Sequence, residues 1–319
     1  MDMPDSGRWD GRTYYGRPQL KPAPFNNWLV GSYVFLAGLS GAAQLLSTVI
    51  DLCCGRKAEG TIRRGRVLSM LAPTLGALCL IFDLHTPKRF YNMLRVVKAT
   101  SPMSLGSWAL VGFGGSSAVT AALQLAAERV HGRGWMRGLA RIAQLPAALT
   151  GGFLASYTAS LLSATSTPRW AVGGRSRAVQ FAGASVASAA AAMSIGEDCD
   201  RRARDLDNIA IAALTVELAA TLASDHAQRK AGIHHSPPTR DSVGITLPLG
   251  LFFVSQLLPR RARTVSAVAS LAALSGGLLM RIGVLRDGDK SAERPDISMR
   301  FAQPDNLPGS HGFSARSAH

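Results

Sequence analysis

Glu217 is the only acidic residue that lies well inside an otherwise uncharged stretch of the chain, residues 208–224. A carboxylate surrounded by apolar side chains is costly unless it is protonated, paired or next to water. Glu217 is therefore a candidate for moving protons. The alternative is a structural role, as a hydrogen-bonding acid or as the partner of Arg281. We predict a proton pathway that includes Glu217 and Arg281, with the structural pair as the alternative.

A second group of polar residues is concentrated in the segment 83–104, between two apolar stretches. Acidic, basic and aromatic side chains follow one another there, among them Asp83, His85, Arg89, Asn92 and Arg95. Such a segment is suited to docking a partner or binding a ligand. The alternative is a loop whose long basic side chains extend along the membrane surface.

Several kinds of metal and nucleotide site are excluded by pattern. None of the seven histidines lies inside an uncharged stretch, where the axial ligands of a buried haem would be needed. The four cysteines form no CxxC pair, so neither an iron–sulfur cluster nor a zinc ribbon is indicated. Walker, HExxH and EF-hand patterns are absent. We expect no haem, cluster or other metal in this chain, and no catalytic residue set of its own.

The elements that must position these residues are long apolar stretches separated by clusters of charge. A membrane-spanning helix needs about 20 mostly apolar residues, and a soluble helix would show an amphipathic pattern instead. Gly, Ala and Ser are abundant within the stretches, as is typical of helices that pack closely in lipid. The stretches are 29–50, 67–82, 105–127, 142–168, 178–196, 208–224, 242–259 and 264–280. They predict an all-α, polytopic membrane bundle of about eight transmembrane helices.

The stretches also divide the chain into three parts. We expect a polar N-terminal arm at 1–28, a membrane domain at 29–285 and a flexible polar tail at 286–319. An even number of helices places both chain ends on the same side of the membrane, and the Lys/Arg balance leaves that side open. The net charge of +15 comes from residues that flank the membrane, so we expect contact with the lipid bilayer and none with nucleic acid.

Residues 83–95, DLHTPKRFYNMLR, and 101–108, SPMSLGSW, resemble the signature D-L-x-x-P-x-R-F-x-N-M-L-R-V…S-P-M-S-x-G-S-W. That signature belongs to the NrfD/polysulfide-reductase (PsrC-like) family of membrane subunits. The arm at 13–25 and the start of the first apolar stretch are also similar to that family. Further matches are residues 157–170, around Tyr157 and Trp170, and Arg281 with Gly288 near the end of the chain. The resemblance extends over nearly the whole chain.

The resemblance implies a multi-pass protein of the inner cell membrane that takes part in a respiratory chain. Such subunits anchor a four-cluster iron–sulfur subunit and bind quinone or quinol in the nearby leaflet. Electrons pass through the clusters to a molybdopterin or multihaem catalytic subunit. The bound quinone is then the only electron carrier within this chain, which is a non-catalytic membrane subunit of an oxidoreductase. Arg89, Asn92 and Arg95 are expected to dock the partner.

Helix counting places the candidate quinone ligands in one leaflet. Tyr33 lies about one turn into the first helix, at the position of a histidine in some family members, and Tyr157 lies about three turns before the end of the fourth. Asp83 and His85 close the second helix on the same side. Quinone chemistry needs hydrogen bonds to the headgroup and a route for protons. We predict a quinone site of Tyr33, Tyr157, Asp83 and His85.

Each of these residues also has a structural interpretation. The tyrosines could belong to an interfacial aromatic belt, Asp83 could pair with Lys88 or Arg89, and His85 could be a solvated loop residue. Two other functions remain open for the whole chain. A secondary transporter predicts substrate flux by this chain alone and related halves in sequence, which are not evident. A passive membrane scaffold predicts that Tyr33 and Tyr157 are dispensable.

Overall fold

The structure of the protein is a computed structural model. It describes residues 20–84, 87–95, 97–98, 100–129, 134–233, 239–258, 262–294 and 297–298. Most of the expected arm, most of the tail and His85 lie outside the described residues. The described part is helical and contains no strand. Its elements are α1 (Asn27–Cys54), η2 (Gly55–Ala58), α2 (Glu59–Asp83), η3 (Pro87–Leu94), α3 (Pro102–Arg129), α4 (Gly134–Ser163), α5 (Pro168–Ala171), α6 (Gly174–Ile195), α7 (Asp200–Lys230), α8 (Thr239–Leu257) and α9 (Ala262–Glu293).

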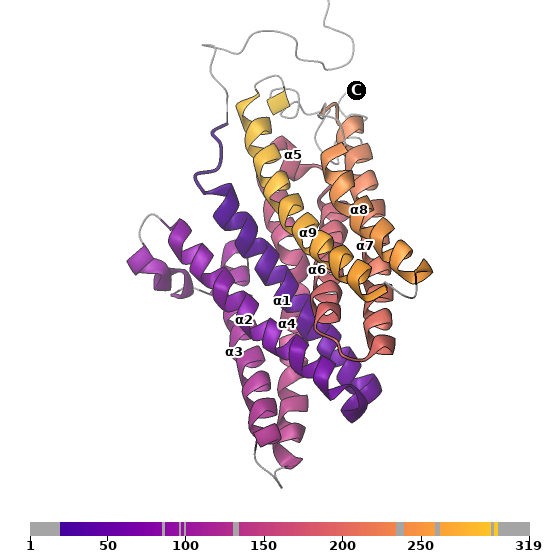
Figure 1. Cartoon of the computed structure of the whole chain (residues 1–319). Helices are drawn as coiled ribbons and strands as arrows, with labels where there is room; N and C mark the ends of the chain where they lie inside the picture. The colour runs from indigo at the N-terminus through magenta and orange to yellow at the C-terminus, as the bar shows by residue number, and fades with distance from the viewer. Residues whose placement is uncertain are drawn as a thin grey trace, which may run out of the picture.

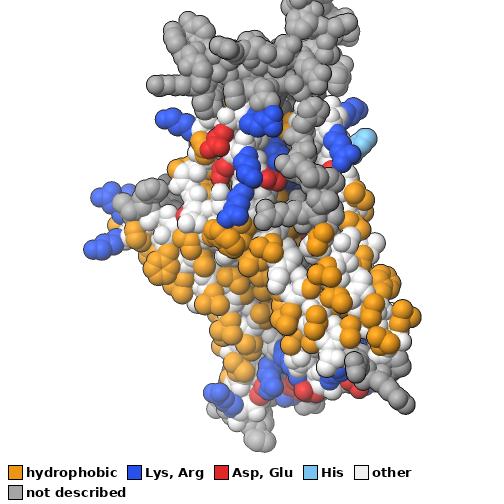
Figure 2. All heavy atoms as spheres, turned by 45° about the horizontal axis from the view of Figure 1, so that its top comes forward, with side chains coloured by type: hydrophobic (Ala, Val, Ile, Leu, Met, Phe, Trp, Pro, Cys, Tyr) orange, Lys and Arg blue, Asp and Glu red, His pale blue; other side chains and the backbone are white. Residues whose placement is uncertain are grey.

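The described helices confirm the prediction of a polytopic membrane bundle. Seven of them are long and apolar enough to cross a membrane, and α8 adds a shorter apolar stretch, Val243–Leu257. On the face shown in Figure 2, hydrophobic side chains form a band across the middle of the molecule, and charged side chains gather toward its two ends. An exterior of this kind is stable in hydrocarbon, because each helix satisfies its own backbone hydrogen bonds. The protein is a multi-pass membrane protein.

The helices run up and down between two ends of the bundle. We call the end where α1 begins and α9 ends the terminal side, and the other end the opposite side (Figure 1). At the terminal side Asn26 caps α1 through its side-chain oxygen, which accepts from the N–H groups of Trp28 and Leu29. The backbone N–H of Asn26 donates to Asp83 at 2.8 Å, so the start of α1 is tied to the end of α2.

The eight long helices form two sets of four that pack side by side. The first bundle contains α1, α2, α3 and α4, and the second contains α6, α7, α8 and α9. They meet mainly where α1 and α4 pack on α6, and where α1 packs on α9. A residue of α1 can therefore contact both bundles.

Small residues permit the closest helix crossings. A Cβ atom on Gly41 of α1 would lie 2.2 Å from the carbonyl oxygen of Gly151 of α4, and one on Gly276 of α9 would lie 2.2 Å from that of Gly244 of α8. A side chain at Gly41 or Gly276 would therefore push two backbones apart. These contacts agree with the role expected for small residues inside a membrane bundle.

Three helices, α2, α4 and α7, begin eight residues before the uncharged stretches at 67–82, 142–168 and 208–224. The charged residues near these starts extend each helix beyond the apolar region, where water solvates them. One consequence is that Asp207, expected in a loop, lies in α7 and is buried.

Candidate functional site

Three of the four predicted quinone ligands lie on the terminal side of the first bundle. Tyr33 comes from α1, Asp83 from the last turn of α2 and Tyr157 from α4. Tyr33 is partly buried, and its hydroxyl lies near enough to that of Tyr157 for the two to interact electrostatically. The ring of Tyr33 approaches Gly76 of α2, where a Cβ atom would lie 3.7 Å away. The fourth predicted ligand, His85, lies outside the described residues.

Tyr157 packs against the first turn of α3. Its hydroxyl donates a hydrogen bond to the carbonyl oxygen of Pro102, and its ring lies over Gly106. A Cβ atom at Gly106 would lie 2.3 Å from three atoms of the phenol, so no larger residue fits without a shift. Phe153 covers the ring from the preceding turn of α4, with centroids 5.1 Å apart. Tyr157 therefore packs on the SPMSLGSW motif at residues 101–108. This contact was not predicted from the sequence.

A similar fit joins two further segments of the family resemblance. Trp170 of α5 donates its indole N–H to the carbonyl oxygen of Val284 at 2.9 Å. Its ring occupies the space beside Gly288 of α9, where a Cβ atom would lie 1.9 Å from the indole. Phe25, just before α1, stacks on the same indole at 6.2 Å. Segments far apart in sequence thus meet on the terminal side.

The predicted docking residues lie on an exposed segment. Arg89, Asn92 and Arg95 are all exposed; Arg89 and Asn92 are part of η3 and Arg95 directly follows it. This segment follows α2 and projects from the side of the helix bundle (Figure 1). Phe90 and Tyr91 are about half exposed beside these polar residues. The surface mixes cationic and aromatic side chains at the same end of the membrane as Tyr33 and Tyr157.

The two predicted proton-pathway residues are buried in the second bundle. Glu217 of α7 is 3% exposed and Arg281 of α9 is 1% exposed. Arg281 donates to Ser185 at 2.7 Å and to the carbonyl oxygens of Phe181 and Gly277. Its guanidinium also lies over the rings of Phe35 and Phe181. Its charge attracts Glu217, although no ion pair between them occurs within 4.0 Å among the described side chains.

Arg281 also contacts the first bundle. A Cβ atom on Gly38 of α1 would lie 2.9 Å from its guanidinium, and Phe35, one of the two rings beneath it, also belongs to α1. Tyr33 packs in the same cluster as Met280, the residue before Arg281. Arg281 therefore lies at the seam between the bundle of the tyrosines and the bundle of Glu217.

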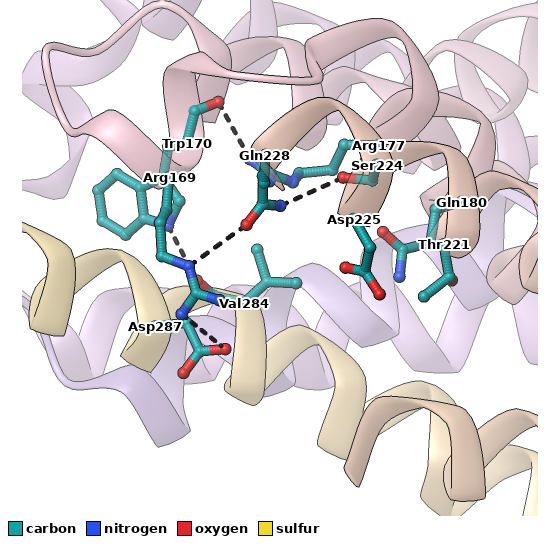
Figure 3. A pocket seen from close by; sticks show the side chains of 10 residues that line it. All are labelled: Arg169, Trp170, Arg177, Gln180, Thr221, Ser224, Asp225, Gln228, Val284 and Asp287. Atoms are coloured by element: carbon teal, nitrogen blue, oxygen red, sulfur yellow. Dashed lines mark hydrogen bonds and ion pairs between the residues drawn. The ribbon is translucent and has the colours of Figure 1, made fainter. Parts of the chain in front are cut away.

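A small polar cavity lies on the terminal side of the second bundle, and Figure 3 shows the residues that line it. The space open to the centre of a water molecule is about 30 Å³. One water needs about 10–15 Å³ of such space, so the cavity has room for about two waters and for no organic ligand. Its lining residues come from α5, α6, α7 and α9: Arg169, Trp170, Arg177, Gln180, Thr221, Ser224, Asp225, Gln228, Val284 and Asp287.

The opposite side of the first bundle holds a buried charged network that sequence reasoning missed. Arg66 of α2 donates to Asp51 of α1 at 3.0 Å and to Gln124 of α3 at 2.6 Å. It also donates to Gln144 of α4, which in turn donates to Asp51 at 3.0 Å. A cavity of about 360 Å³ adjoins Asp51, Arg66 and Arg141. Asp51 directly follows the apolar stretch at 29–50, yet it is only 8% exposed.

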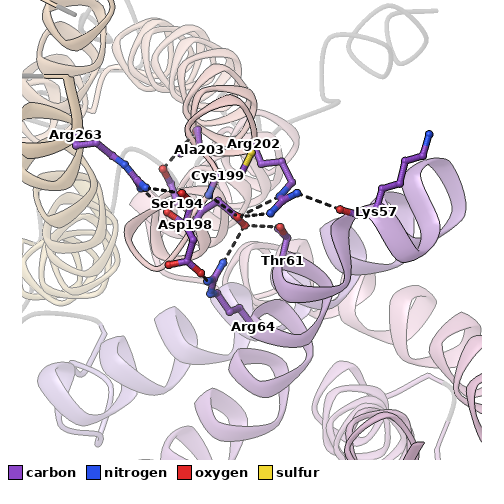
Figure 4. Close-up of polar contacts among 10 residues, drawn as sticks. Lys57, Thr61, Arg64, Ser194, Asp198, Cys199, Arg202, Ala203 and Arg263 are labelled. Carbon is purple, nitrogen blue, oxygen red and sulfur yellow. Dashed lines mark hydrogen bonds and ion pairs between the residues drawn. The ribbon is translucent and has the colours of Figure 1, made fainter. Parts of the chain in front are cut away.

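A second charged cluster, also on the opposite side, joins the two bundles through Glu197. Its carboxylate accepts from Arg64 of α2 at 2.9 Å, from Arg202 of α7 at 3.1 Å and from Thr61. Figure 4 shows Arg64, Arg202 and Arg263 converging on this loop from three helices. Burial opposes ionisation of Glu197, but the hydrogen bonds from Thr61, from the N–H of Cys199 and from Arg202 together lower the pKa of its carboxyl.

Asp207 is a further buried acid that the sequence did not single out. It is 5% exposed and accepts hydrogen bonds from Ser194 of α6 at 2.6 Å and Ser266 of α9 at 2.7 Å. Glu217 is therefore not the only acid buried in the second bundle. The signal was present in the sequence, because Asp207 directly precedes the apolar stretch at 208–224.

The fold and the site define a helical, multi-pass membrane protein whose aromatic ligand candidates and candidate docking residues share one membrane side. Residues 19–223 match the family model described as polysulphide reductase, NrfD, and this covers more than half of the sequence. The protein belongs to the NrfD family, which confirms the resemblance found in the sequence. It is also 34% identical over 90 residues to the C subunit of the polysulfide reductase of Wolinella succinogenes. That match spans 27% of this protein and 28% of the relative.

Proposed function

We propose that this protein is the quinone- or quinol-interacting membrane anchor of a multisubunit oxidoreductase in the inner cell membrane. It passes electrons between the quinone pool and a four-cluster iron–sulfur subunit, which in turn serves a molybdopterin or multihaem catalytic subunit. Family membership supports this proposal, as does the name of the relative, one subunit of a polysulfide reductase. The substrate of the catalytic subunit does not follow from these features.

The observation that carries the proposal is the position of Tyr157. Its hydroxyl donates to Pro102 and its ring packs on Gly106, two residues of the family signature, and its hydroxyl interacts electrostatically with that of Tyr33. The hydroxyl proton is donated to Pro102 and one lone pair of the oxygen faces the N–H of Gly106, so the other lone pair remains to accept a hydrogen bond from a quinol hydroxyl. Asp83 and His85 complete the proposed site at the end of α2, as groups that bind the headgroup and relay its protons.

The exposed segment at η3 is the proposed docking surface for the iron–sulfur subunit. Arg89 and Arg95 supply positive charge, Asn92 supplies hydrogen bonds, and the neighbouring aromatic rings supply apolar area. The segment begins four residues after Asp83, so a docked partner would lie close to the proposed quinone site. Electron transfer between the quinone and an iron–sulfur cluster requires that the two carriers lie close together.

The proposed proton pathway runs through Glu217 and Arg281. A carboxyl group can bind and release a proton, whereas Arg281 keeps its charge and favours the carboxylate after release. Position supports the assignment, because Arg281 lies between Glu217 and the bundle that contains Tyr33.

A passive scaffold is the second candidate, and one observation favours it. The Tyr157 hydroxyl already donates to Pro102 and interacts with the backbone N–H of Gly106, so it has partners without any ligand. In that case Tyr157 only stabilises the contact between α3 and α4. The scaffold and the quinone anchor make opposite predictions for quinol binding.

The proposed iron–sulfur partner is tested by purifying the tagged protein in mild detergent. Iron is then measured in the eluate. We expect iron to co-purify with the wild type and to be lost when Arg89 and Arg95 are both changed to Glu. The matched control is Arg204→Glu, an exposed charge reversal on the opposite side. If the wild type elutes without iron, the proposed partner is wrong, and transport by the isolated protein becomes the next measurement.

A further inference from the structure

The polar cavity between α5, α6, α7 and α9 is lined by the side-chain amide of Gln180, which makes no hydrogen bond to another described residue. Gln180 is 4% exposed and lines the cavity. Figure 3 shows its amide beside Thr221 and Asp225 with no hydrogen bond drawn, and none occurs among the described residues. Buried amide groups almost always have hydrogen-bond partners, and the free space beside Gln180 is large enough for water. Water is therefore the natural partner of Gln180.

The cavity extends from a partly exposed rim to a buried floor. Asp225 and Asp287 are partly exposed, whereas Thr221 and Ser224 are buried. Arg169 holds Asp287 at 3.3 Å, and Arg177 donates to the carbonyl oxygen of Trp170 at 3.0 Å. Neither contact fills the central space. Water can thus reach the buried floor past charged groups that it also solvates.

Glu217 lies one helical turn below this floor. Thr221 lines the cavity and donates to the carbonyl oxygen of Glu217 at 2.8 Å. Residues four apart lie on one face of a helix, about 6 Å apart along its axis. On the facing helix, Gln180 lines the cavity and Gly183 packs on the backbone of Glu217, where a Cβ atom would lie 3.2 Å from its nitrogen. Gln180 with Thr221 and Gly183 with Glu217 are successive layers of one interface.

We infer that this cavity is the aqueous inlet through which Glu217 exchanges protons with the compartment on the terminal side. A proton moves from hydronium, through the water held by Gln180 and Thr221, to the Glu217 carboxylate, and it returns by the same route. The titratable groups that face the cavity are Arg169, Arg177, Asp225 and Asp287, and Arg281 faces Glu217 from α9. The two arginines at the cavity and Arg281 keep their charge, so the groups that can change protonation are the carboxyls of Asp225 and Asp287 at the rim and of Glu217 below the floor.

The use of this inlet during turnover rests on the proposed quinone function. Oxidation of one quinol releases two electrons, which go to the iron–sulfur subunit, and two protons, which must reach water. Glu217 and its inlet give those protons an exit on the side that holds Tyr33 and Tyr157. Protons released there do not cross the membrane.

The experiment is infrared spectroscopy of the reconstituted protein after mixing with D₂O. The Glu217 carboxyl band is assigned by its absence in Glu217→Gln, and the rate of its deuterium shift is measured. Gln180→Leu removes the amide with little change in size, and Asp225→Asn neutralises the rim. We expect Gln180→Leu to slow exchange about tenfold, because a buried water loses one hydrogen-bond partner. Gln256→Leu, an exposed change on α8, is the matched control and should leave the rate unchanged.

Exchange at wild-type rates in both Gln180→Leu and Asp225→Asn would contradict the proposed inlet. A Glu217 band that never exchanges in the wild type would contradict it as well. If Gln180→Leu does not fold, the Asp225→Asn rate decides alone. Binding of a quinol analogue is measured on the same samples. Absence of binding refutes the proposed quinone function, whereas normal binding with no Glu217 exchange refutes only the inlet.

Discussion

At the scale of single residues, two glycines show how the placement of a ring can depend on packing. Gly106 makes room for the ring of Tyr157, and Gly288 makes room for the ring of Trp170. The sequence identified Tyr157 as a ligand candidate and placed it on the same membrane side as Tyr33. It could not identify the contact with Gly106, because 51 positions separate the two residues and no local pattern links them.

Gly106→Val is expected to displace the Tyr157 phenol and lower the affinity for a quinol analogue about tenfold, the effect of one lost hydrogen bond. Isothermal titration calorimetry of the purified protein measures it. Gly114→Val is the control on the same helix, since nothing lies within 4 Å of a Cβ atom there. Equal affinities in the two variants would show that the packing of Tyr157 on Gly106 does not influence ligand binding.

Asp51→Asn is expected to lower the free energy of unfolding by about 3–5 kcal/mol, because it leaves the buried charge of Arg66 without its partner. The free energy is measured from the unfolding transition of the detergent-solubilised protein. Asp198→Asn serves as the control, since its side chain is 94% exposed. A similar small effect in both variants would mean that water entering the adjoining cavity solvates Arg66.

At the scale of elements, the uncharged stretches predicted the eight long helices but not their ends. Charged first turns extend α4 and α7 past the apolar region, so the loops are shorter than expected. This error hid Asp207, which lies in the second turn of α7 and bonds to serines of two other helices. A charge marks the edge of the hydrocarbon only where no neighbouring helix buries it.

Gly151→Leu is expected to destabilise the crossing of α1 and α4 by about 1–3 kcal/mol, because the added side chain meets the backbone of Gly41. Gly152→Leu places the same side chain where nothing lies within 4 Å of a Cβ atom. Thermal unfolding in detergent compares the two variants. The crossing would not be tight in the membrane if Gly151→Leu were as stable as Gly152→Leu.

At the scale of the whole molecule, two four-helix bundles share the work proposed for the protein. The first contains the candidate quinone ligands and the second contains Glu217 and its cavity, with Arg281 at the seam. Helix partners could not be predicted from the sequence, because small residues are abundant in nearly every stretch and favour many pairings. Charged contacts on the opposite side, centred on Glu197, also join the bundles.

The junction at Glu197 is expected to weaken in acid. Its pKa is lower in the folded protein than the ordinary value of 4.5, so its contribution to stability is fully present above pH 4.5 and is lost as the pH falls through the folded value. The difference in unfolding temperature between the wild type and Glu197→Gln should therefore shrink on acidification. A difference independent of pH would show that the carboxylate charge does not stabilise the junction.

The most direct test of the central claim is the binding of a quinol analogue to Tyr157→Phe, with Tyr91→Phe as the matched control. Tyr91 also carries a phenol on the terminal side, but it is 55% exposed on η3 and away from the proposed site. The quinone-anchor proposal predicts that affinity falls about tenfold in Tyr157→Phe and stays at the wild-type value in Tyr91→Phe. Wild-type affinity in Tyr157→Phe, or no binding to the wild-type protein, would contradict it and favour the passive scaffold.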